Sequence, residues 1–121
     1  MTTLSPELQQ AAQDFGAALR QHGMIQQYLQ AVSALNAEPA ARDLDERFET
    51  LRADLVARQR AGEDLPADEV QAFYALRKEV TGNPLIEKRD NALTMAKGYL
   101  ANVGLDLNQA LGLDFVKIAN A

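Results

Sequence analysis

Residues 81–112 read TGNPLIEKRDNALTMAKGYLANVGLDLNQALG and predict the longest helix of the chain. Asn83-Pro84 is a strong start signal, because asparagine can cap free N–H groups and proline suits the first helical turn. Gly112 suits the left-handed position that follows a helix. One face at helical spacing is formed by Leu85 or Ile86, then Arg89, Leu93, Ala96, Leu100, Val103, Leu107 and Leu111. This segment indicates a helical fold.

The three other prolines also stand where helices should begin, and His22-Gly23 interrupts the helix that Pro6 starts. No segment alternates as a half-buried strand would. The predicted helices span about 6–21, 24–36, 39–61, 66–81 and 84–111, followed by a short tail at 112–121. We therefore expect a single all-α domain over residues 1–121, an antiparallel helical bundle of four to five helices.

The composition excludes several classes of protein. The 121 residues carry a net charge of −5 and no cysteine, so disulfides, thiolate zinc sites and iron–sulfur ligation are not expected. The basic pairs Arg77-Lys78 and Lys88-Arg89 lie beside glutamates and are interpreted as solvated helix faces, so direct nucleic-acid binding is not expected. No signal peptide or membrane-length apolar run is visible, which predicts a cytoplasmic protein without membrane insertion.

Candidate chemical groups are few. His22 is the only histidine, and the sequence places no nucleophile or orienting acid with it, so it is interpreted as a helix-end residue. The densest acidic run lacks the Glu-x-x-His element of helical metal sites and the glycine of a calcium loop. That run is interpreted as a solvated face and consists of Asp43, Asp45, Glu46 and Glu49. We expect no catalytic residue, cofactor or metal.

Unequal helix lengths predict association. The last helix would be roughly 42 Å long and the helix after Pro66 about 22 Å, so a monomeric bundle would leave apolar overhang. We expect a homo-oligomer, a dimer or a tetramer, that also binds other proteins. Its interface candidates are Leu44, Phe48, Leu51, Leu55, Leu100, Val103 and Leu107. The stripe around Phe48 fits an ordinary bundle core equally well, because cores and interfaces use the same packing.

Two other functions compete with this interpretation. A small-molecule-binding bundle would hold an interior apolar pocket between Phe15, Tyr28, Phe73 and Tyr99. An enzyme would need converging carboxylates or His22 in a cleft. A non-enzymatic regulatory or adaptor protein instead predicts exposed apolar stripes and no polar pocket.

The order of these elements resembles the YlbF/YmcA (YheA-like) family of small bacterial helical proteins. The resemblance covers about residues 8–115. It rests on Tyr28-Leu29-Gln30-Ala31, Ala34-Leu35-Asn36-Ala37-Glu38-Pro39-Ala40-Ala41, Phe48-x-x-Leu51, the turn from Gly62 to Glu69, Asn83-Pro84-Leu85-Ile86 and Leu111-Gly112-Leu113-Asp114-Phe115.

The resemblance implies short antiparallel helices in intertwined dimers or tetramers. It also implies a regulatory, non-enzymatic role, as in relatives that influence competence, sporulation and biofilm development and assist RNA processing by a membrane-associated endoribonuclease. Certain relatives bind iron–sulfur clusters through cysteines. This chain has none, so that cofactor does not carry over.

Overall fold

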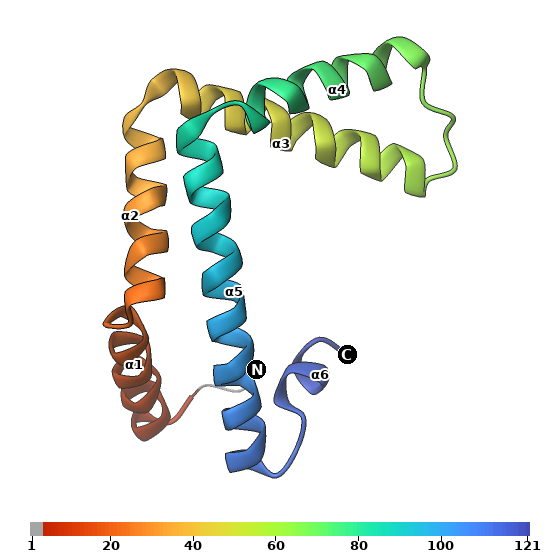
Figure 1. Ribbon diagram of the computed structural model, residues 1–121. Coiled ribbons are helices and arrows are strands. Elements are labelled where there is room, and N and C mark those ends of the chain that lie inside the picture. The colour runs from red at the N-terminus through yellow and green to blue at the C-terminus, as the bar shows by residue number, and fades with distance from the viewer. Residues whose placement is uncertain (1–3) are drawn as a thin grey trace. The chain divides into compact units, whose positions relative to one another are not determined.

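The structure is a computed structural model that describes residues 4–121 (Figure 1). Over these residues every regular element is a helix, and no strand occurs. The prediction of an all-α protein is therefore confirmed. The helices are α1 (Pro6–Arg20), α2 (Gly23–Ala37), α3 (Pro39–Arg60), α4 (Ala67–Thr81), α5 (Pro84–Leu111) and α6 (Phe115–Ala119).

Helix starts follow the proline signals. Pro6 and Pro39 stand in the first turns of α1 and α3, whereas Pro66 is the residue just before α4. The Asn83 side chain caps α5, because its Oδ1 accepts hydrogen bonds from the N–H groups of Leu85 at 3.0 Å and Ile86 at 3.2 Å. These two N–H groups have no partner inside the helix, so a side-chain acceptor stabilises this end.

Replacing Asn83 by alanine is expected to lower the free energy of unfolding by about 1 kcal/mol, because both N–H groups lose their acceptor. Thermal unfolding followed by circular dichroism would measure the loss. The matched control is Asn102→Ala, the same change at an exposed position in the interior of α5. That control should be neutral or slightly stabilising, since alanine is the better helix former. Equal effects of the two changes would contradict the capping role.

Two glycines end helices as the sequence predicted. Gly62 and Gly112 have φ of 85° and 73°, a left-handed conformation that glycine adopts without steric cost. Gly23 does not share it, since the positive-φ glycines among the described residues are these two. The interruption predicted at His22-Gly23 is nevertheless present, since α1 ends at Arg20 and α2 begins at Gly23. The start of α2 is supported by His22, whose Nδ1 accepts a hydrogen bond from the N–H of Met24 at 3.2 Å.

The C-terminal tail contains the short helix α6. Asp114 caps it by accepting from the N–H of Lys117 at 3.0 Å. Asn108 of α5 fixes the turn, because its side-chain oxygen accepts from the N–H of Phe115 at 2.7 Å. Gly104 lies against this tail, since a Cβ there would stand 3.5 Å from a methyl carbon of Val116. The tail therefore approaches α5 through Val116.

The chain divides into two compact units. The terminal unit holds the chain up to Gln30 together with Ala92–Ala121, and the central unit holds Ala31–Asn91. The central unit contains the core. Its buried centre is formed by Leu35, Ala41, Val80 and Ile86, against which Leu44, Phe48 and Leu85 pack. The Phe48 and Phe73 rings also stack at 5.4 Å, which joins α3 to α4.

The terminal unit has little core of its own. Among the described residues of this unit only Ala96 is buried. Apart from Tyr74, the exposed large apolar side chains of the described chain all belong to it. They are Leu4, Leu8, Phe15, Leu29, Met95, Leu100, Leu105, Leu111, Leu113, Phe115, Val116 and Ile118. Apolar surface is thus concentrated in one unit rather than scattered.

Candidate interaction surfaces

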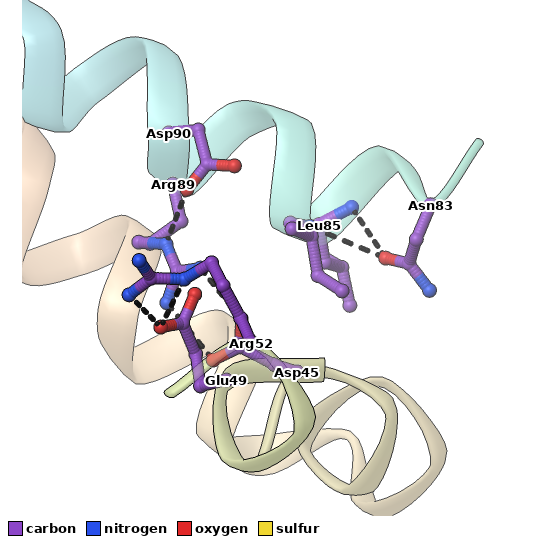
Figure 2. Close-up of polar contacts among 8 residues, drawn as sticks. Asp45, Glu49, Arg52, Asn83, Leu85, Arg89 and Asp90 are labelled. Atoms are coloured by element: carbon purple, nitrogen blue, oxygen red, sulfur yellow. Dashed lines mark hydrogen bonds and ion pairs between the residues drawn. The ribbon is translucent and has the colours of Figure 1, made fainter. Parts of the chain in front are cut away.

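A half-buried ion pair organises the central unit (Figure 2). The two terminal nitrogens of Arg89 on α5 donate to the two carboxylate oxygens of Asp45 on α3, at 2.6 and 3.0 Å. The two side chains are only 18% and 17% exposed. Arg89 Nε also donates to Asp90 at 2.8 Å. Such bidentate, charge-assisted pairs are stronger than single neutral hydrogen bonds.

The interpretation of Asp45 and Arg89 as solvated residues is therefore wrong. Packing shields each charged group from water, and the opposite charge of the partner compensates for the lost hydration. The two residues lie 44 positions apart in the chain. Hydrogen bonding to Asp45 raises the pKa of Arg89 and outweighs the opposing effect of desolvation. A signal was available, since Arg89 falls in the apolar phase of its helix. An arginine at such a position needs a buried acceptor.

The rest of the acidic run matches its interpretation. Asp43 forms an exposed pair with Arg47 at 3.5 Å, and Glu49 pairs with Arg52 at 2.7 Å along the same helix. Pairs of this kind contribute little to stability. Within residues 4–121, no cluster of three or more potential ligands could hold a metal ion.

Helices α3 and α4 lie side by side as a hairpin (Figure 1). An apolar groove runs along this hairpin. It has a volume of about 750 Å³. This groove is called the hairpin groove, and it is lined by Arg47, Thr50, Leu51, Asp54, Ala72, Ala75, Leu76 and Glu79. Of the interface candidates on α3, Leu51 lines this groove, Leu44 and Phe48 pack on the core, and Leu55 is 7% exposed.

Ion pairs hold the closed end of the hairpin. Arg58 near the end of α3 contacts Glu69 on α4 at 2.8 Å, and it reaches Asp54 and Glu63 at 3.5 Å. The nearby Glu69 carboxylate raises the pKa of Arg58. These contacts fix which residues of α3 and α4 lie opposite each other.

A second hollow lies in the terminal unit. It has a volume of about 390 Å³ and is lined by Phe15, Ala18, Leu19, Tyr99, Val103, Asp106, Leu107 and Ala110. The interface candidates Val103 and Leu107 belong to it, whereas Leu100 is 45% exposed and lies outside its lining. Of the four rings expected to surround an interior pocket, Phe15 and Tyr99 line this hollow. Phe73 lines a separate one of about 220 Å³, and Tyr28 lines neither.

His22 has a structural setting in the terminal unit. Besides accepting from Met24, its ring stacks on that of Tyr99 with centroids 3.8 Å apart and planes inclined by 15°. The stack ties the α1–α2 junction to α5. The interpretation as a helix-end residue therefore stands, although His22 supports the start of α2 rather than the end of α1.

The fold and these surfaces define a small all-α protein with apolar grooves on helical faces. The chain belongs to the YlbF/YmcA family, since the family model described as "Control of competence regulator ComK, YlbF/YmcA" matches residues 8–111. The resemblance read from the sequence is thereby confirmed. The match ends at the last residue of α5 and covers residues of both compact units.

Solved structures share the fold, and one of them is from Bacillus subtilis. Bacillus subtilis RicA, crystallised in complex with RicF, aligns with a TM-score of 0.67 over 90% of this chain and 96% of RicA, at 18% identity. No curated protein sequence matches the chain. Within residues 4–121, no helix combines the length and apolar character that crossing a bilayer requires.

Proposed function

We propose that the protein is a non-enzymatic, cytoplasmic regulatory adaptor that acts by self-association and by contacts with other proteins. The observation that carries the proposal is the terminal unit, which buries one alanine of its described residues and exposes a large set of apolar side chains. A large amount of exposed apolar surface is typical of protein interfaces, because leaving it in water is unfavourable.

The family supports the regulatory part of the proposal. Its description names control of a competence regulator, and RicA was solved together with another protein, RicF. We infer that this chain likewise binds proteins, with a second copy of itself among the partners. Competence, sporulation, biofilm formation and RNA processing are the regulated processes that its relatives suggest. Contacts with nucleic acid, a cofactor or a membrane form no part of the proposal.

Changing Leu100 to aspartate tests the proposal. Leu100 is 45% exposed on α5, so a charge there should leave the fold intact and disfavour burial against a partner. We expect the variant to lose either its self-association, measured by light scattering after size-exclusion chromatography, or its partners in affinity capture from native lysate. The matched control is Asn102→Asp, which adds the same charge at an exposed position of α5.

The control should behave as the unchanged chain does. If the Leu100 variant keeps both the same molar mass and the same captured proteins, the terminal unit is not an interaction surface and the proposal loses its basis. A chain that is monomeric and captures nothing would contradict the proposal as a whole.

A further inference from the structure

The hollow of the terminal unit, called the terminal groove, follows one stripe of α5. The α5 residues of its lining stand at positions 99, 103, 106, 107 and 110, which is helical spacing over about three turns, or roughly 17 Å. The opposite wall is formed by Phe15, Ala18 and Leu19 of α1. Two helices therefore form the walls of a groove long enough to receive a third helix.

Helix α1 presents an apolar stripe that the described part of the chain leaves uncovered. None of the residues of α1 is buried, and Leu8 and Phe15 are 58% and 47% exposed. Leu8, Ala12, Phe15 and Leu19 share one face of the helix. Most of the stability of such a helix comes from packing its apolar face, so α1 would gain from a further element laid along it.

The groove is shaped before anything binds. Tyr99, which lines it, stacks on the ring of His22 with centroids 3.8 Å apart. His22 also accepts the hydrogen bond from Met24 that supports the start of α2. These contacts hold the junction of α1 and α2 beside α5. A preformed groove saves a partner part of the ordering cost of binding.

One charged group stands in this apolar lining, and it is an acid. Asp106 is the only charged residue among those that line the groove. Within residues 4–121 it forms no ion pair. A helix laid in the groove would remove water from around this carboxylate, which is unfavourable unless the helix brings a positive charge.

We propose that the terminal groove binds an amphipathic helix of a different protein, one that carries a lysine or arginine beside its apolar stripe to pair with Asp106. The inference rests on the proposed adaptor function and names the class of its partner. An amphipathic helix laid in an apolar groove is a recurring mode of recognition. The apolar walls would supply the buried surface, and Asp106 would select helices by charge.

Free helices of the terminal unit in a second copy match this description poorly. Helix α1 carries Glu7 and Asp14 against the single base Arg20, so it would bring acids toward Asp106. Helix α6 has five residues and is shorter than the groove. Charge and length therefore favour a different protein as the occupant.

Two synthetic helical peptides test the inference. Both carry the same leucine stripe with glutamines on the opposite face, and they differ only in one central residue beside the stripe, lysine or glutamate. Titration calorimetry on the full chain should show the lysine peptide binding about tenfold or more tightly than the glutamate peptide. Asp106→Asn should remove this preference and Asp106→Lys should reverse it, because the charge that faces the peptide is removed or inverted.

Hydrogen exchange gives a second readout of where the peptide binds. The lysine peptide should slow exchange of the amides in residues 8–19 of α1 and 99–110 of α5, since a helix packed between them opposes their local unfolding. Slower exchange confined to other helices would contradict the proposed site.

The matched control is Asp64→Lys, the same charge change at an exposed residue in the loop between α3 and α4. It should keep the preference for lysine, and circular dichroism should show every variant folded. Equal binding of the two peptides to the unchanged chain, or a preference that Asp106→Lys leaves in place, would overturn the inference. A change in molar mass caused by Asp106→Lys would also overturn it, because the groove would then belong to a second copy. The Leu100 variant tests the adaptor proposal separately, since Leu100 lies outside this lining.

Discussion

Replacing Ile86 by alanine is expected to lower the free energy of unfolding by about 3–4 kcal/mol, among the largest losses that one substitution should cause in this chain. Ile86 is 1% exposed and belongs to the buried centre of the central unit with Leu35 and Val80. The change removes three buried carbons and leaves a cavity, and the unit has few other fully buried side chains to compensate.

Denaturant titration followed by circular dichroism would measure this loss. Ile86→Val removes a single methylene group and should cost only about 0.5–1.5 kcal/mol. Leu105→Ala is the exposed control, since Leu105 is 62% exposed and its truncation should change stability little. If Ile86→Ala proved no more destabilising than Leu105→Ala, the centre of the fold would lie elsewhere.

Replacing Asp45 by alanine is expected to cost about 2–3 kcal/mol, because it leaves the Arg89 guanidinium in a half-buried site without its bidentate acceptor. Both side chains are less than a fifth exposed, so water replaces the lost hydrogen bonds poorly. Asp90 still accepts from Arg89 at 2.8 Å, which keeps the expected loss below that of a fully orphaned charge.

The control for Asp45 lies two residues away. Asp43→Ala breaks an exposed pair with Arg47 on the same helix and should cost less than about 0.5 kcal/mol. Thermal unfolding of both variants under the same conditions would compare them directly. Equal losses would show that the long-range pair contributes no more than a surface pair does.

The Arg89 ion pair also carries an expectation for pH. Because the pKa of Arg89 is raised in the folded chain, its contribution is fully present below the ordinary arginine pKa and is lost only in strongly alkaline solution. The free energy of unfolding, measured between pH 6 and pH 9, should therefore show no change caused by titration of Arg89.

Local signals determined the helices. Pro6, Pro39 and Pro84 lie in first turns because proline fixes a helical φ and lacks a hydrogen that the first turn cannot use. Gly62 and Gly112 end helices because a left-handed residue is needed there. Each of these effects depends on a few neighbouring residues, so the chain order alone is sufficient to read them. The family resemblance rested on the same local elements.

The tertiary structure decided which surfaces are free. Asp45 belongs to an acidic run and reads as solvated until Arg89, far along the chain, is brought onto it. Leu55 and Leu51 belong to one predicted stripe, yet packing buries the first and leaves the second in the hairpin groove. Helical periodicity identifies an apolar face but not the element that covers it, because covering depends on contacts between distant residues. The concentration of exposed apolar residues in the terminal unit follows from the same packing.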